Sequence, residues 1–236
     1  MLKKISPRYN IDANIFIKNI LWYFLSTLFF SRLFYVIGKW TDFKYITEPF
    51  EFFIANDYDF SLVGALVGFI SVLILHLKLR KESFDKYVDP LVITFIFILF
   101  IGYIGAFLGG QVYGRMTDFG IEIPYNHSYT PIPYQVPIFP LPIIYSFLYF
   151  LLFSGLYISS MYIHLKGLIG YFGIIIFSSI LLIFEFFSGK YDILKDFYGI
   201  NMPQLGAIIL IMISIYRLIR IFKKNDGKEI TILHKK

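Results

Sequence analysis

The sequence predicts an all-α polytopic membrane protein, a six-helix bundle with a cap rich in proline and tyrosine on its extracytoplasmic side. Of the 236 residues, 57% are hydrophobic and 16% are charged, and the mean hydropathy is +0.67. A soluble domain has about a quarter of its residues charged, so this chain has too much apolar surface for a soluble core. We expect a single transmembrane domain over residues 1–222 and a polar cytoplasmic tail over residues 223–236.

Six apolar segments have the length that a membrane span needs, which is about 20 residues for a helix. The first follows a short basic stretch without a small-residue cleavage site, so we interpret it as a retained span and not as a removed signal peptide. The predicted spans cover residues 15–37, 61–79, 88–110, 140–163, 167–187 and 203–222.

Basic residues are concentrated in every second connecting segment. They lie in the N-terminal stretch, in loop 76–87 and at the C-terminal end, whereas loop 38–60 is rich in Asp and Glu and segment 111–139 has Arg115 as its one basic residue. By the positive-inside rule, both termini are then cytoplasmic. The net charge of +6 is explained by these helix ends, and we expect no nucleic acid partner.

Segment 111–139, between the third and fourth predicted spans, is expected to form the cap. It contains four prolines and four tyrosines. Proline lacks the backbone donor that a helix uses, and tyrosine favours the membrane–water interface. We therefore predict an extended or short-stranded structure there.

The residue types present restrict the chemistry. The chain has no cysteine, which excludes disulfides, thiolate metal sites and a cysteine nucleophile. Its four histidines lie far apart in the sequence, without the spacing of metal ligands. We expect neither a metal site nor a cofactor.

The most informative segment is GYIGAFLGGQVYGRMTD, residues 102–118, in which five glycines lead into a polar loop that begins at Arg115. Glycine at this density lets helices approach closely or lets the chain leave helical geometry. The segment resembles the signature of the bacterial prolipoprotein diacylglyceryl transferases, roughly GRxGNFxNGExxGRxTD. Tyr103 stands at the family's arginine and Ala106 at its asparagine.

The resemblance extends over about residues 22–222. FFSRLFYVI keeps Arg32 and Tyr35 of a stretch similar to the family's GGRIGYVLF. VGALVG is similar to a His-Gly-Gly-Leu-x-Gly motif, with Val63 in place of the histidine. The family's first helix has no counterpart, so the resemblance implies a divergent, N-terminally shortened member with six spans in place of seven.

The second half of the chain keeps part of the family's polar pattern. FPLPIIYS is similar to the family's His-Pro-x-x-Leu-Tyr-Glu and keeps Tyr145, with Ser146 at the glutamate position. The fifth span resembles the family's arginine–three–glutamate helix and keeps Glu185, with Leu181 at the arginine position. INMPQLGAI resembles the Ser-Met-Gly-Gln opening of the family's last helix and keeps Gln204.

The resemblance implies transfer of a diacylglyceryl group from phosphatidylglycerol to the cysteine of a lipoprotein precursor. A phosphate calls for arginine, whose planar fork stays charged, and the thiol needs a base such as histidine or a carboxylate. We therefore name Glu185 as the candidate catalytic residue and Arg32 and Arg115 as candidate phosphate ligands. The other candidate substrate-binding residues are Gly105, Gly110, Gly114, Tyr145 and Gln204.

These residues also have structural interpretations. Arg32 lies inside the first span, where it either pairs with Glu185 or snorkels to the extracytoplasmic face. Arg115 is either a phosphate ligand or a loop arginine at the lipid headgroups. The glycines either pack helices together or line the site.

Two functions remain open. One is a phosphatidylglycerol-dependent transferase of the bacterial cytoplasmic membrane, with lipoprotein precursors as acceptors. The other is a non-catalytic descendant that binds lipid or regulates a partner, which the loss of the histidine, the asparagine and two arginines favours. A small-molecule transporter is a weaker alternative, because no pair of interrupted helices with buried charge marks a midplane site.

Overall fold

The computed structural model describes residues 1–38, 60–122, 136–163, 165–189 and 199–225. Within these ranges six helices are long and apolar enough to cross a membrane. They are α3 (Ile20–Gly38), α5 (Leu62–Arg80), α6 (Asp85–Leu108), α7 (Leu141–Tyr162), α8 (Leu168–Phe184) and α10 (Met202–Asn225). The predicted all-α polytopic class is confirmed, and each predicted span overlaps one of these helices.

The first and last helices differ in extent from their predicted spans. The first span was predicted from residue 15, but residues Asn14–Lys18 form a separate short helix, α2. The Asn19 side chain donates from Nδ2 to the Ile15 carbonyl at 2.8 Å, and such a bond competes with continuation of the helix. At the other end, α10 runs to Asn225, and the rest of the predicted tail lies outside the described residues.

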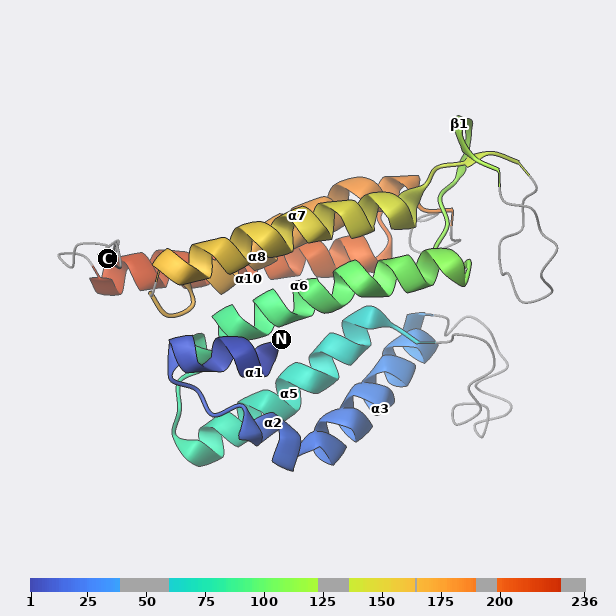
Figure 1. Ribbon diagram of the computed structural model, residues 1–236. Coiled ribbons are helices and arrows are strands. Elements are labelled where there is room, and N and C mark those ends of the chain that lie inside the picture. The colour runs from blue at the N-terminus through green and yellow to red at the C-terminus, as the bar shows by residue number, and fades with distance from the viewer. Residues whose placement is uncertain (39–59, 123–135, 164, 190–198, 226–236) are drawn as a thin grey trace.

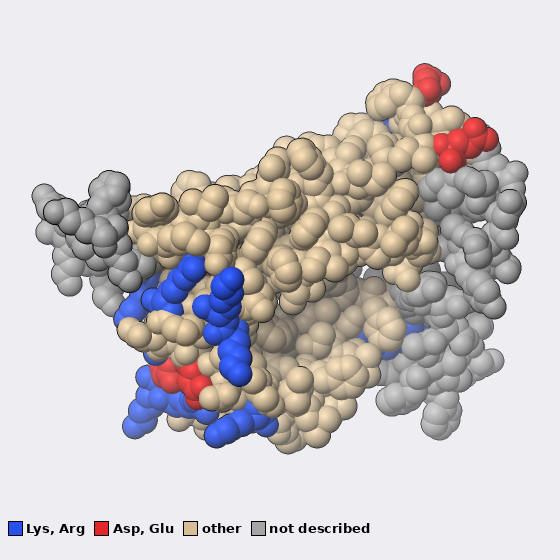
Figure 2. Space-filling view, in the orientation of Figure 1, with Lys and Arg blue, Asp and Glu red and all other residues tan. Residues whose placement is uncertain are grey.

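The long helices form two groups (Figure 1). Helices α6, α7, α8 and α10 pack on one another, and α3 and α5 form an antiparallel pair beside α6. The surface is hollowed between α6 and this pair (Figure 2). We call the end with the N-terminal segment and the α5–α6 turn the basic end, because lysine and arginine gather there. The opposite end is the β1 end.

Small residues join α3 to α5. A Cβ atom on Gly64 would overlap the Phe30 carbonyl, and one on Gly68 would overlap the Ser26 carbonyl. The Ser26 hydroxyl donates to the Gly68 carbonyl at 2.9 Å. Close backbone approach through glycine and serine is how membrane helices associate when lipid offers no hydrophobic driving force.

The N-terminal segment is part of the core. Helix α1 (Leu2–Ile5) and the single turn η1 (Ser6–Tyr9) bury their apolar residues, and Arg8 donates to the Ser160 hydroxyl of α7 at 2.9 Å. Its other guanidinium nitrogen donates to the Tyr157 hydroxyl at 3.2 Å. From the sequence we predicted only a basic stretch before the first span. In the structure this segment links the α3–α5 pair to α6 and α7.

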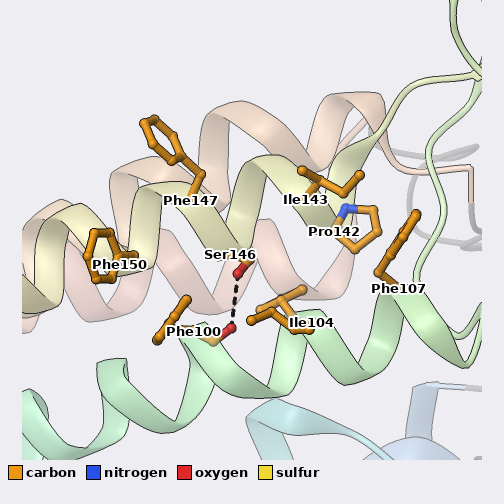
Figure 3. Close-up of a pocket in the computed structure, with 9 residues that line it drawn as sticks. Phe100, Ile104, Phe107, Pro142, Ile143, Ser146, Phe147 and Phe150 are labelled. Carbon is orange, nitrogen blue, oxygen red and sulfur yellow. Dashed lines mark hydrogen bonds between the residues drawn. The ribbon is translucent and has the colours of Figure 1, made fainter.

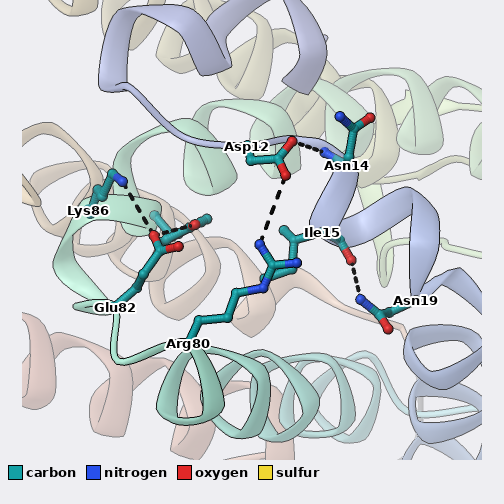
Figure 4. A network of polar contacts seen from close by, with 8 residues as sticks. Asp12, Asn14, Ile15, Asn19, Arg80, Glu82 and Lys86 are labelled. Carbon is teal, nitrogen blue, oxygen red and sulfur yellow. Dashed lines mark hydrogen bonds and ion pairs between the residues drawn. The ribbon is translucent and has the colours of Figure 1, made fainter.

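Polar contacts join the elements of the basic end (Figure 4). Arg80 lies 3.9 Å from Asp12, and Lys86 lies 3.3 Å from Glu82. The Tyr87 hydroxyl donates to Glu82 at 2.7 Å, and this bond, helped by Lys86, holds the pKa of Glu82 below its ordinary value.

Asp89 of α6 caps the first turn of α8. Its fully buried carboxylate accepts from the backbone nitrogen of Gly167 at 2.8 Å and from that of Gly170 at 2.6 Å. A carboxylate at this place satisfies amides that have no partner within their own helix. Here the cap comes from another helix, so it also fixes α8 against α6.

The cap contains strand β1 (Met116–Ile121), which agrees with the short-stranded structure predicted for 111–139. Met116 and Ile121 both bridge to Ile138, and the Thr117 nitrogen donates to the Pro137 carbonyl at 3.2 Å. Residues 123–135, which contain three of the four prolines counted above, lie outside the described residues.

Candidate functional site

Glu185 lies at the β1 end, where α8 gives way to the single turn η3 (Glu185–Phe187). Its half-buried carboxylate is held from two sides. The Tyr145 hydroxyl of α7 donates to Oε2 at 3.2 Å, and the Asn201 amide donates to Oε1 at 3.2 Å. Two neighbouring helices therefore fix the position of this carboxylate.

Asn201 and Gln204 form a reciprocal cap at the start of α10. The Gln204 nitrogen donates to the Asn201 side chain at 3.0 Å, and the Asn201 nitrogen donates to the Gln204 side chain at 3.0 Å. Asparagine followed three residues later by glutamine is the sequence pattern of a capping box. The Gln204 amide also donates to the Leu182 carbonyl at 3.2 Å, so Gln204 holds α10 to α8.

Three tyrosines pack beside Glu185. The Tyr103 ring lies 4.9 Å from the Tyr145 ring and 5.5 Å from the Tyr149 ring, and the last two are stacked at 5.7 Å, centre to centre. We call Glu185, Asn201 and these three tyrosines the Glu185 cluster.

An apolar groove of about 430 Å³ runs between α6 and α7 beside this cluster (Figure 3). Tyr103 lines the groove on one side and contacts Tyr145 and Tyr149 on the other. The Ser146 hydroxyl donates to the Phe100 carbonyl at 3.1 Å and joins the two helices at the floor of the groove. The remaining lining residues are Ile104, Phe107, Pro142, Ile143, Phe147 and Phe150.

The loop after α6 runs alongside η3 and brings Arg115 next to Phe187, two residues after Glu185. The Arg115 nitrogen donates to the Phe187 carbonyl at 2.9 Å, and its guanidinium carbon lies 5.1 Å from the centre of the Phe187 ring. Phe187 in turn stacks on Phe139 at 4.5 Å. The Arg115 side chain is exposed. Its backbone is held by the bond to Phe187, which lies two residues after Glu185.

The three candidate glycines have different surroundings. Gly110 has φ of 62°, the left-handed conformation that glycine adopts without strain. Gly114 leaves no room for a Cβ atom, which would overlap the Phe139 carbonyl. Gly105 is exposed, and a Cβ atom there would meet nothing within 4 Å.

The predicted pair of Arg32 and Glu185 is not formed: no ion pair joins them among the residues that the structure describes. Arg32 is buried on α3, with its guanidinium 5.5 Å from the Tyr35 ring centre. Glu185 is held by Tyr145 and Asn201 instead. Arg32 lies on α3, which packs on α5, and Glu185 follows α8, which packs on α7 and α10.

The arrangement combines a fixed carboxylate, a long apolar groove and an exposed arginine near the same end of the bundle. The sequence model of the prolipoprotein diacylglyceryl transferase family matches residues 1–220. The chain belongs to the prolipoprotein diacylglyceryl transferase family. The six apolar helices and this membership indicate a multi-pass protein of the bacterial inner membrane.

One similar protein is the phosphatidylglycerol–prolipoprotein diacylglyceryl transferase of Idiomarina loihiensis. The two sequences are 30% identical over 118 residues. The match spans 48% of this chain and 41% of the relative, so it covers less than half of either protein.

Two positions at which this chain departs from the pattern described above lie at or beside the same cluster. Tyr103 is part of it, and Leu181 is buried one turn before Glu185. A Cβ atom on Gly206 of α10 would lie 3.3 Å from a Val63 methyl group. Val63 therefore lies next to the first turns of α10, the helix that Asn201 and Gln204 cap. Tyr103 and Leu181 therefore lie at or beside the Glu185 cluster, and Val63 lies against α10.

The sequence analysis missed two members of the cluster, Asn201 and Tyr149. Asn201 had a usable signal, because it stands three residues before Gln204 at the start of an apolar span. Tyr149 had none beyond its spacing, one helical turn after Tyr145 on what proves to be the buried face of α7.

Proposed function

We propose that this protein binds phosphatidylglycerol and transfers its diacylglyceryl group to the cysteine of a lipoprotein precursor. The observation that carries the proposal is the position of Glu185, which Tyr145 and Asn201 hold beside an apolar groove of about 430 Å³. Ligand sites of about 300–1,000 Å³ with a few placed polar groups are typical of small-molecule binding. The family and the name of the relative from Idiomarina loihiensis supply the reaction.

The lipid is proposed to bind with an acyl chain in the groove between α6 and α7. The aromatic and branched side chains there, among them Phe100, Ile104 and Phe147, match a hydrocarbon chain. The phosphate binds at Arg115, because a guanidinium offers a phosphate two parallel donors. The glycerol headgroup is then directed toward the Glu185 cluster.

In the proposed reaction, Glu185 acts as general base. Its carboxylate takes the proton of the cysteine thiol, and the sulfur attacks the terminal methylene carbon of the diacylglyceryl group. A carbon–sulfur bond forms, the carbon–oxygen bond to the phosphate breaks, and glycerol phosphate leaves with the electron pair. Arg115 neutralises the charge on the leaving phosphate.

The proposed orientation places the β1 end outside and both termini in the cytoplasm. Support comes from the basic end, where lysines and arginines gather while acidic side chains lie over the β1 end (Figure 2). Basic residues at the cytoplasmic ends of membrane helices are the general rule.

A second candidate function is that of a non-catalytic lipid-binding protein. The observation that favours it is the chemistry at three positions around Glu185, where Val63, Tyr103 and Leu181 replace the family's histidine and two arginines. With these residues the cluster offers a carboxylate, phenols and apolar surface, and Arg115 lies in the loop that bonds Phe187, two residues after Glu185.

The two candidates are separated by measuring lipid binding and group transfer on the same preparation. The purified protein is placed in nanodiscs that contain phosphatidylglycerol or phosphatidylcholine, and a peptide with a lipoprotein-type cysteine is added. A peptide that gains the mass of a diacylglyceryl group supports the transferase. Selective binding of phosphatidylglycerol without transfer supports the second candidate, and binding without lipid preference contradicts both.

A further inference from the structure

Tyr149 has a buried hydroxyl group that the structure leaves unpaired. The side chain is 0% exposed, and within the described ranges its hydroxyl has no hydrogen-bond partner. Buried hydroxyls in proteins almost always have a partner, since an unpaired one costs free energy comparable to a lost hydrogen bond. The exception at Tyr149 therefore needs a physical explanation.

The surroundings of Tyr149 place it in the Glu185 cluster. Its ring contacts Tyr145 on its own helix, Tyr103 of α6 at 5.5 Å and Phe177 of α8 at 5.6 Å. The unpaired group thus lies next to the proposed lipid site, toward the middle of the bundle.

The hydrogen-bonding groups of the cluster indicate which kind of ligand fits. The Tyr145 hydroxyl donates its proton to Glu185, so it can only accept from a ligand. The Tyr149 hydroxyl can both donate and accept. A ligand hydroxyl can donate to the Tyr145 oxygen and accept the proton of Tyr149, whereas a phosphate oxygen cannot donate to Tyr145 and an ammonium group cannot accept the Tyr149 proton.

We propose that Tyr149 binds a hydroxyl group of a polyol lipid headgroup and thereby makes the site selective for anionic lipids that carry such hydroxyls. This inference rests on the proposed function and adds the basis of its lipid selectivity. The phosphate remains at Arg115, and the headgroup beyond it reaches the tyrosines.

Tyr103 separates Tyr149 from the groove, since it lines the groove and contacts Tyr149 with the same ring. The neighbouring Gly102 and Gly105 are exposed, and a Cβ atom on either would meet nothing within 4 Å. The α6 backbone on either side of Tyr103 is therefore not clamped by close neighbours. A rotation of the Tyr103 side chain would join the groove to the Tyr149 hydroxyl.

The test compares two anionic lipids that differ in headgroup hydroxyls. Phosphatidylglycerol has two, and phosphatidylethanol has the same charge and none. We expect the wild-type protein in nanodiscs to prefer phosphatidylglycerol, and Tyr149→Phe to lower its affinity for this lipid by about two- to tenfold, as for one lost hydrogen bond. The affinity of the variant for phosphatidylethanol should stay at the wild-type value.

Ser178→Ala is the matched control, because Ser178 is also 0% exposed and its hydroxyl is also unpaired in the described part of the chain. Both substitutions should leave the melting temperature without added lipid unchanged or raise it, but only Tyr149→Phe should reduce the lipid preference. If Tyr149→Phe keeps the preference for phosphatidylglycerol, the proposed role of Tyr149 is overturned while the proposed function stands. The Tyr149 hydroxyl would then bind only a buried water. If Tyr149→Phe loses affinity equally for both lipids, the role is also overturned, because a packing defect then explains the loss. A wild-type protein that does not bind phosphatidylglycerol would contradict the proposed function itself.

Discussion

Tyr145 and Glu185, forty residues apart in the sequence, meet at the β1 end with the tyrosine hydroxyl 3.2 Å from the carboxylate. Each comes from a helix whose path is fixed by other contacts: α7 by Ser146 to α6, and α8 by Asp89 to the same helix. The carboxylate is therefore placed by the fold of the whole bundle. This placement makes single substitutions at the cluster informative.

Glu185→Gln is expected to slow transfer strongly while it preserves lipid binding. The amide keeps the shape of the side chain and an acceptor for Tyr145, but it cannot take a proton from a thiol. General-base catalysis is worth about 10²–10⁴-fold, so the transfer rate should fall by that factor and phosphatidylglycerol affinity should change little. Tyr145→Phe serves as the control, with a smaller loss. Equal rates for wild type and Glu185→Gln would remove Glu185 from the chemistry.

Gly114→Ala and Gly105→Ala are expected to behave in opposite ways. A Cβ atom at Gly114 would overlap the Phe139 carbonyl, so alanine there should displace the Arg115 loop, lower the melting temperature and weaken lipid binding. A Cβ atom at Gly105 meets nothing, and alanine in a helix is favoured over glycine by about 1 kcal/mol. Thermal unfolding in detergent measures both. Weaker lipid binding by a stable Gly105→Ala variant would show instead that Gly105 lines the substrate site.

Asp89→Ala is expected to destabilise the protein by about 2–3 kcal/mol, because two amides of α8 lose their cap inside the bundle. Asp85→Ala is the control on the same helix. Its carboxylate accepts from the Tyr171 hydroxyl and lies 3.9 Å from Arg217, but it is 35% exposed, so the loss should stay below about 1 kcal/mol. Unfolding curves that rank the two variants in the reverse order would contradict the capping role.

The orientation can be tested by labelling introduced cysteines, since the native chain has none. We expect a membrane-impermeant maleimide to label Asp118→Cys in intact cells and Lys3→Cys or Lys223→Cys only after lysis. The charge distribution is the physical reason. Labelling of Lys3→Cys from outside would reverse the proposed topology.

Wild-type protein is expected to transfer too slowly to rescue a bacterial strain depleted of its own transferase at ordinary expression. Val63, Tyr103 and Leu181 remove a base and two cations, and each lost electrostatic donor costs about 10²–10³-fold in rate. Val63→His combined with Tyr103→Arg should raise the transfer rate of the purified protein. Full rescue by the wild type would show that Glu185 and Arg115 suffice. A double variant that folds and binds lipid but transfers no faster would favour the non-catalytic candidate.

Part of the candidate site was predictable from the sequence. Tyr145, Glu185 and Gln204 were selected from short motifs, and the structure brings all three to the β1 end. The predicted pairing of Glu185 with Arg32 is not formed among the described residues, although each residue was correctly assigned to a span. Asp89 was visible only as an acidic residue before a proline, and its role as a cap for α8 depends on a helix that begins 79 residues later.

By itself, the sequence determined the fold class and the approximate limits of the six apolar helices. It could do so because apolarity over about 20 consecutive residues is a local property that needs no knowledge of neighbouring helices. Only the tertiary structure decided which side chains meet: Asn201 on Glu185, Tyr103 on Tyr149, and the N-terminal segment inside the core. The physical reason is that lipid tails are as apolar as leucine. A membrane helix is therefore hydrophobic on its lipid face and its protein face alike, and its rotation in the bundle cannot be deduced from hydropathy.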